Sequence, residues 1–158
     1  MRKDASVAAD TADARSGMKR EAIEALFERQ QECWDNIDAE GLAADYADDV
    51  VVESPMAGAH SGRAAAEATI KAFFAAFIDM KMSTDGLLID GNRVARIAKV
   101  EGTHIGTFLG LPPTGKHFVL PVVFLYELRN GKIIHERRIY DFTGLLVQIG
   151  VLKDRKST

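Results

Sequence analysis

The chain has few of the residues on which disulfide-bonded and metal-binding proteins depend. Its 158 residues include one cysteine, Cys33, so no disulfide can form within the chain and a reducing compartment is expected. Cys33 falls in an amphipathic pattern and is interpreted as a small core residue rather than a nucleophile. The four histidines show no short ligand spacing, and neither H-x-x-x-H nor C-x-x-C occurs. We therefore expect no metal site.

Long apolar runs and an excess of positive charge are also missing. No stretch approaches the length of a membrane span, and the N-terminal stretch has no apolar signal-peptide core. The formal net charge of −3 provides no electrostatic attraction to nucleic acid or to an anionic membrane. We expect a cytoplasmic protein with neither nucleic acid nor membrane as a partner.

What remains is the composition of one globular domain. Hydrophobic residues make up 47% of the chain and charged residues 27%, and the length suffices to bury a core without disulfides or metal. Residues 1–17 show no apolar periodicity and are expected to form a flexible lead-in. The domain is expected over residues 18–152, followed by a flexible tail over 153–158.

Helical patterns occupy the first half of the domain. Apolar residues from Ile23 to Trp34 recur at helical spacing and predict a long first helix. Asp38 is the expected N-cap of a short second helix that extends through Tyr46. Ser61 is the expected cap of a third helix, whose phenylalanines and isoleucine supply an apolar face. A brief strand is predicted between the second and third helices, in DDVVVESP.

Strand patterns occupy the second half. Four strands are predicted from Lys81 onward, with turns at Gly91-Asn92 and Asn130-Gly131, and Asn-Gly is a strong hairpin signal. The segment GLLVQIGVL predicts a short closing helix. Helices followed by antiparallel strands predict an α+β domain in which a curved sheet wraps around a helical layer. Such a cone has an internal pocket suited to a small apolar ligand.

The stretch GLPPTGKH, residues 110–117, matches most of a phosphate-binding loop but lacks its chemistry. Its glycines and lysine fit the pattern, whereas His117 stands where a metal-binding hydroxyl is required. Two prolines remove backbone N–H donors, and the sequence that follows favours a strand rather than a helix. We interpret the stretch as a rigid connection that enters a strand.

The segments GTHIGTFLGLPPTGK and NGKIIHERRIYDFTGLLVQIGVL resemble the SnoaL-like polyketide cyclases, also called ester cyclases. The Trp34 region and DYADDVVVESP support this resemblance more weakly, and it extends over about residues 18–152. It implies the cone fold of the nuclear transport factor 2 superfamily, with a cystatin-like curved antiparallel sheet. It also implies a homodimer, a small apolar organic ligand and no cofactor.

The resemblance further implies acid/base catalysis by one carboxylate. Asp141 in YDFTGLL matches the aspartate that acts in characterised polyketide cyclases. The implied reaction is an intramolecular aldol closure, in which a carboxylate removes a proton from a carbon between two carbonyls and later protonates the alkoxide. Such chemistry requires no cofactor. The alternative is that Asp141 caps the closing helix.

One position departs from the family pattern. Characterised cyclases have a histidine two residues before the aspartate, where this chain has Ile139. His104, Arg137 and Arg138 are the candidates to replace it. The structural alternatives are that His104 is a turn or mouth residue, and that the arginines are solvated or paired with Glu136.

Three other functions are associated with this fold. The catalytic groups of ketosteroid isomerases would fall at Ser54, Gln30 and Val123, none of which has the required chemistry, so steroid isomerisation is disfavoured. Limonene-type epoxide hydrolases use an arginine and two aspartates. This chain keeps the same charge pattern with Lys99, Glu101 and Asp141. Lysine is a poor substitute for a bidentate arginine, and Lys99 and Glu101 are alternatively an exposed strand pair. A non-catalytic ligand-binding module is the third alternative.

Alternation along the strands predicts that Lys99 and Glu101 share one face, as do Arg137, Ile139 and Asp141. The predicted site therefore has catalytic and substrate-binding residues from several strands. The catalytic residues are Asp141 and His104, and the substrate-binding residues are Trp34, Ser54, Phe77, Lys99, Glu101, Val123, Arg137, Arg138 and Tyr140.

Overall fold

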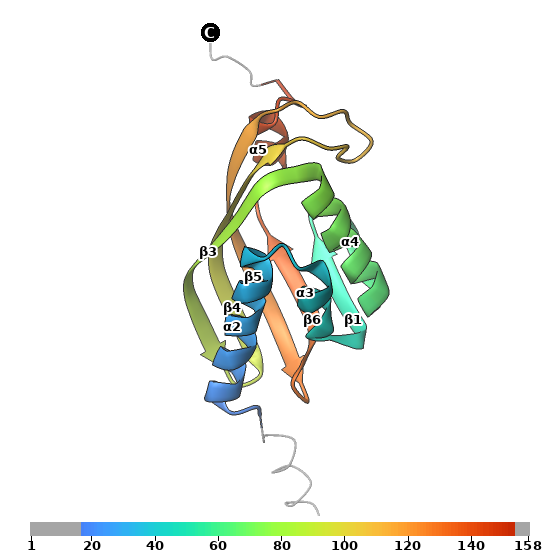
Figure 1. The fold of residues 1–158 in the computed structure, drawn as a ribbon. Helices are drawn as coiled ribbons and strands as arrows, with labels where there is room; N and C mark the ends of the chain where they lie inside the picture. Colours follow the sequence, from blue (N-terminus) through green and yellow to red (C-terminus); the bar gives the residue numbers. More distant parts are fainter. Residues whose placement is uncertain (1–16, 154–158) are drawn as a thin grey trace, which may run out of the picture.

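The computed structural model describes residues 17–153 and has a curved sheet with helices packed on its inner face (Figure 1). The strands lie in the order β2-β1-β6-β5-β4-β3. They are β1 (Tyr46–Ser54), β2 (Gly58–Ser61), β3 (Phe77–Asp90), β4 (Arg93–His104), β5 (His117–Arg129) and β6 (Lys132–Ile139). The helices are α2 (Arg20–Asp35), α3 (Ala39–Ala44), α4 (Arg63–Ala76) and α5 (Phe142–Gln148). The predicted α+β cone is confirmed.

The sheet is mixed rather than antiparallel, which corrects the expectation from the sequence. Strand β1 pairs in parallel with β6, so that Val52 lies opposite Glu136 and Glu53 opposite Arg137. The other pairs are antiparallel. Parallel neighbours need a long connection, and here α4 and the β3–β5 meander separate β1 from β6 in the chain.

The two predicted hairpins are confirmed. Strands β5 and β6 turn at Asn130 and Gly131, which both have positive φ, at 51° and 75°. Two consecutive residues with positive φ match the twist of antiparallel strands, and asparagine and glycine tolerate this conformation. The turn that contains Gly91 joins β3 to β4.

The helix starts agree with the sequence in one case and differ in another. Asp38 caps α3, because its carboxylate accepts a hydrogen bond from the Gly41 amide at 2.9 Å. The second helix is shorter than predicted, since Tyr46 already belongs to β1. Ser61 ends β2 and does not cap α4, which begins after Gly62 without a side-chain cap.

The connection between β4 and β5 is held at both ends by backbone hydrogen bonds. Its two ends are joined at His104, whose carbonyl accepts from Gly115 N at 2.8 Å and whose N–H donates to Lys116 O at 2.9 Å. At its near end, Gly106 N donates to Ala76 O at 3.0 Å. The prediction that this connection enters a strand is confirmed, because β5 begins at His117.

Within residues 17–153, no helix has the length and hydropathy needed to cross a membrane. The expected flexible lead-in and tail concern residues 1–17 and 153–158. Apart from residues 17 and 153 themselves, they lie outside the part of the chain that the structure describes.

The close passage of Gly106 over the end of α4 allows a test of the fold. A Cβ at Gly106 would lie 2.4 Å from the Ala75 carbonyl oxygen, so the backbone would have to shift. We expect Gly106→Ala to lower the free energy of unfolding by about 1–3 kcal/mol, as overpacking does. Gly86→Ala is the matched control, because a Cβ there meets nothing within 4 Å, and we expect a change within about 0.5 kcal/mol. Urea denaturation measures both, and equal effects would contradict the predicted clash.

Candidate functional site

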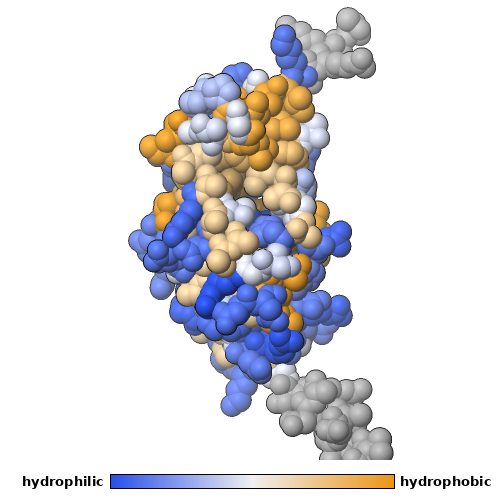
Figure 2. Space-filling model, turned by 90° about the vertical axis from the view of Figure 1, so that its right-hand side faces the viewer, coloured by the Kyte–Doolittle hydropathy of each residue, from blue (hydrophilic) through white to orange (hydrophobic). Residues whose placement is uncertain are grey.

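A cavity of about 70 Å³ lies between the inner face of the sheet and the helices α2, α3, α4 and α5. Most of its wall is apolar and aromatic. Its lining comprises Gln30, Trp34, Leu42, Tyr46, Met56, Thr69, Ile70, Phe73, Val100, Leu120, Val122, Phe124, Tyr126, Glu136, Arg138, Tyr140 and Leu145. Figure 2 shows the neighbouring outer surface, which is apolar in its upper half and hydrophilic in its lower half. The site therefore suits an apolar ligand that meets few polar groups.

The polar groups of the cavity include a carboxylate held between a phenol and a guanidinium. Glu136 is the one carboxylate in the lining, and 3% of its side chain is exposed. The Tyr46 hydroxyl donates to Glu136 Oε2, and Arg138 Nε donates to Glu136 Oε1 at 2.5 Å. Because residues two apart on a strand share a face, Glu136 and Arg138 enter the cavity together.

The surroundings fix the protonation of these groups. Burial raises the pKa of Tyr46 well above its ordinary value, and the nearby Glu136 carboxylate raises it further. Burial would lower the pKa of Arg138, but the attraction of Glu136 outweighs it and the pKa rises. Burial also raises the pKa of Tyr140, although Arg138 opposes this shift. Tyr46 and Tyr140 are therefore neutral phenols at neutral pH, and Arg138 is a cation.

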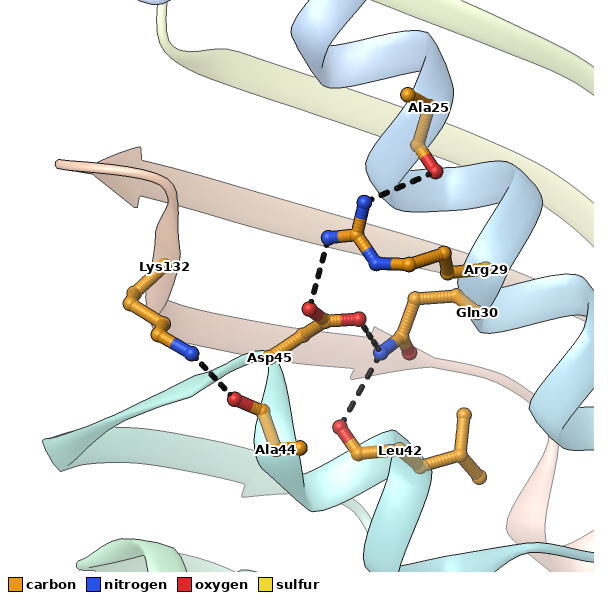
Figure 3. A network of polar contacts seen from close by, with 7 residues as sticks. All are labelled: Ala25, Arg29, Gln30, Leu42, Ala44, Asp45 and Lys132. Atoms are coloured by element: carbon orange, nitrogen blue, oxygen red, sulfur yellow. Dashed lines mark hydrogen bonds and ion pairs between the residues drawn. The ribbon is translucent and has the colours of Figure 1, made fainter.

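A second polar network fixes α2 to the start of β1 (Figure 3). Gln30 Nε2 donates to the Leu42 carbonyl at 3.1 Å and to Asp45 Oδ2 at 2.9 Å. Arg29 donates to the other Asp45 oxygen at 2.9 Å. Since both amide hydrogens of Gln30 are used in these bonds, we assign Gln30 a structural role at the base of the cavity.

Several of the predicted residues lie at or near the cavity. Trp34, Arg138 and Tyr140 line it. Ser54 lies beside it in an adjoining surface pocket, and its hydroxyl accepts a hydrogen bond from Ala57 N at 3.1 Å. The prediction that an arginine pairs with Glu136 is confirmed for Arg138.

Other predicted residues lie on the outer face of the sheet. These are Lys99, Glu101, Val123 and Arg137. Lys99 and Glu101 share a face of the sheet, as predicted. This is the outer face, because the even-numbered neighbours such as Val100 are buried on the inner side. Lys99 is exposed, as in the exposed-pair interpretation. The structure does not bring Lys99 and Glu101 together with Asp141 around a common space.

Phe77 and His104 are buried in an aromatic cluster beyond the cavity. The His104 ring is 5.4 Å from that of Phe77, and Phe108 packs against both. His104 has no exposed surface, and its Nδ1 lies 3.1 Å from Thr114 Oγ1. The expectation of a turn or mouth residue is wrong for His104, because the end of β4 is covered by the aromatic side chains and by the loop that contains Thr114.

Asp141 caps α5. Its carboxylate accepts a hydrogen bond from the Gly144 amide at 2.8 Å, and the residue is exposed. The helix-cap alternative is therefore confirmed. Asp141 is not among the residues that line the cavity, and its assignment as the acid/base stays a prediction.

Sequence reasoning missed Tyr46, Tyr126 and Glu136 as residues of the site. The available signal was the period of two along β6, since Glu136, Arg138 and Tyr140 alternate with residues of the outer face. Across residues 17–153, no group of three or more histidine, cysteine, aspartate or glutamate side chains is arranged to hold a metal ion.

The curved sheet and the helices on its inner face define the cone fold of the nuclear transport factor 2 class. Within this class, residues 24–149 match the profile of the SnoaL-like polyketide cyclases. The match covers most of the chain, and the protein belongs to this family.

Individual relatives support the same placement. The nogalonic acid methyl ester cyclase of Streptomyces nogalater is 41% identical over 49 residues, which are 31% of this chain and 37% of that protein. The match thus spans little more than a third of this curated relative. IdmH of Streptomyces antibioticus, a candidate polyketide cyclase, has a TM-score of 0.68 at 25% identity, covering 80% of this chain and 97% of IdmH. TsrD of Streptomyces laurentii shares the fold, with a TM-score of 0.76 at 20% identity over 85% of this chain and 99% of TsrD.

The buried ion pair makes a testable contribution to stability. Arg138→Met leaves the Glu136 carboxylate buried without its cation, and we expect a loss of about 2–4 kcal/mol of unfolding free energy. This is the lower part of the range for buried pairs, because 18% of the Arg138 side chain is exposed. Adding Glu136→Gln should recover much of the loss, since the uncompensated charge is removed. Urea denaturation of both variants measures this.

The exposed ion pairs of Lys71 provide the control. Lys71 contacts Glu67 and Glu40, and 51% of its side chain is exposed. Lys71→Met should therefore leave the unfolding free energy nearly unchanged, because exposed ion pairs contribute little to stability. A loss for Arg138→Met no larger than for Lys71→Met would contradict the interpretation of a buried pair.

Proposed function

We propose that the protein is a cyclase that acts on a small apolar carbonyl compound by acid/base catalysis without a cofactor. The observation that carries this proposal is the Glu136 carboxylate in an otherwise apolar cavity, held by Tyr46 and Arg138. Membership of the cyclase family supports the same reaction class.

Each polar group has a role in an intramolecular aldol closure. Glu136 removes a proton from a carbon that lies between two carbonyls, and the electron pair moves onto the carbonyl oxygen. Arg138 and the phenol of Tyr140 stabilise this enolate oxygen by electrostatic attraction and hydrogen bonding. The carbon then attacks a second carbonyl of the same molecule and forms the C–C bond. The protonated Glu136 returns its proton to the new alkoxide, so that no other reactant is consumed.

Glu136 is a better placed proton acceptor than Asp141. A general base must come within hydrogen-bond reach of the proton that it removes. Glu136 lines the cavity, whereas Asp141 is exposed and does not. Asp141 remains the alternative acid/base implied by the family, and one pair of variants separates the two assignments.

We expect Glu136→Gln to lower turnover by about 100-fold or more, because an amide cannot accept the proton. Asp141→Asn should retain most of the activity, because asparagine is as good a helix cap as aspartate. The first substrate to test is nogalonic acid methyl ester, after which the relative in Streptomyces nogalater is named. Cyclised product is followed by chromatography, and thermal unfolding verifies that both variants are folded.

A second assay does not depend on the natural substrate. The exchange of the acidic C–H protons of methyl benzoylacetate for deuterium, measured by NMR, reports proton removal alone. Catalysed exchange should disappear in Glu136→Gln and persist in Asp141→Asn. The opposite result would return the catalytic role to Asp141. Ligand-induced thermal stabilisation without exchange or product would instead support the ligand-binding module.

We also propose that the protein forms a homodimer through the outer face of the sheet. Ile97, Val123 and Ile139 lie opposite one another on β4, β5 and β6 and form an apolar row. Ile97 is 40% exposed and Ile139 is 48% exposed. Lys99 and Arg137 flank the row and have acidic residues beside them. A second copy related by a two-fold axis can therefore present opposite charges to this face.

A charge at the centre of this row should disrupt the dimer. We expect Val123→Glu to convert the protein to a monomer, because the carboxylate would be buried in an apolar interface. Ala64→Glu, at an exposed position of α4, should leave the mass unchanged. Light scattering coupled to size-exclusion chromatography measures both. A monomeric wild type, or a dimeric Val123→Glu protein, would contradict the proposed interface.

A further inference from the structure

A second arginine is buried beside the cavity and has no role in the proposed reaction. Arg96 on β4 is 1% exposed, which makes it the largest fully buried side chain among the described residues. Its Nε donates to Thr84 Oγ1 at 2.7 Å, and a terminal nitrogen donates to Gln31 Oε1 at 2.6 Å. The other terminal nitrogen, Nη1, is buried and has no hydrogen-bond partner within residues 17–153.

Both direct partners of Arg96 are neutral, so its charge is not balanced by a contacting carboxylate. Burial lowers the pKa of the Arg96 guanidinium, and Tyr126, Glu136 and the exposed Asp35 oppose this shift, but neither carboxylate is hydrogen-bonded to Arg96. An arginine stays charged in proteins, and a buried charge without an ion pair is costly. Such a departure from ordinary packing is expected where a site has a function.

Arg96 does not line the cavity itself but lies next to residues that do. It lies opposite Phe124 on the neighbouring strand, and Phe124 and Tyr126 both line the cavity. Burial raises the pKa of Tyr126, whereas Arg96 opposes this shift by attracting the phenolate. The positive charge of Arg96 is thus felt at the cavity wall through Tyr126.

The charges around the cavity sum to one positive charge. Glu136 and Arg138 are the charged residues of the lining and cancel each other. Asp45 lies behind Gln30 and is paired with Arg29. Arg96 is left over, inside a poorly screened apolar environment where electrostatic interactions are stronger than in water.

We propose that the cavity selects small apolar monoanions, namely compounds that carry one carboxylate on an aromatic or alicyclic skeleton, and that Arg96 sets this preference through Tyr126. The proposal deepens the proposed function, since it names the charge of the ligand in the same cavity. Arg96 acts here as a positioning residue, because it does not itself line the cavity.

The matched probes are 2-naphthoate and 2-naphthamide, which have nearly the same shape and differ in charge. We expect wild-type protein to bind 2-naphthoate at least 10-fold more tightly at pH 7.5, as measured by isothermal titration calorimetry. Measurement in 0.3 M NaCl suppresses attraction by exposed charges but not by buried ones. Trp34 is the one tryptophan of the chain and lines the cavity, so its fluorescence reports whether the probe occupies this site.

The variants test whether Arg96 is the cause. Arg96→Met should reduce the preference to within about 3-fold, and Arg96→Lys should restore most of it by restoring the charge. Replacing a buried charge with an apolar side chain of similar size is often tolerated, so Arg96→Met is expected to fold. Arg93→Met is the matched control, because Arg93 lies exposed on the same strand, does not line the cavity, and its loss should leave the preference unchanged.

The outcomes separate this inference from the proposed reaction. Wild-type protein that binds 2-naphthamide as well as 2-naphthoate overturns the inference, whatever the fate of the variants. A full preference in folded Arg96→Met overturns it as well, and so does the binding of neither probe. Cyclisation of a neutral ester without any preference for anions would retain the proposed function and remove only this inference. Preference for 2-naphthoate without catalysed proton exchange would retain this inference and remove the proposed function.

Discussion

The contact of Glu136 with Arg138 and Tyr46 is the interaction on which the chemistry of the cavity depends. Arg138 comes from the same strand as Glu136, but Tyr46 comes from β1, which reaches β6 by parallel pairing. An antiparallel arrangement of the sheet would give β1 the opposite direction and a different register. The mixed sheet is therefore a condition for the site as well as a detail of topology.

The buried ion pair provides polar groups for chemistry but contributes little to stability compared with apolar side chains in its place. An apolar group in place of a buried ion pair is often neutral or stabilising in proteins. The chain instead places Glu136 and Arg138 among valine, leucine and phenylalanine side chains of β4 and β5. Because the carboxylate and the guanidinium satisfy each other, the cavity can hold charged groups without losing its apolar walls. The same reasoning makes Arg96 unusual, since its contacting partners are a hydroxyl and an amide.

Much of the architecture follows from local sequence signals. Helical periodicity, the Asp38 cap and the Asn130-Gly131 turn each act through neighbouring residues, and each was predictable. The direction of β1 was not, because it depends on a partner more than eighty residues away. The choice of inner face was equally hidden, since β5 carries apolar residues on both faces. Val123 is on the outer face and Val122 on the inner one, and nothing in their chemistry separates them.

Asp141 shows how a shift of one residue changes the interpretation of a carboxylate. Near the end of β6, Glu136 and Arg138 enter the cavity, and Tyr140, directly after the strand, continues this alternation. Asp141 falls in the other phase, where the chain leaves the sheet and starts α5. An aspartate at a helix start can satisfy a free backbone amide, and Asp141 does so with Gly144. Glu136 lies five residues earlier and on the other face, where a ligand can reach it and water is largely excluded.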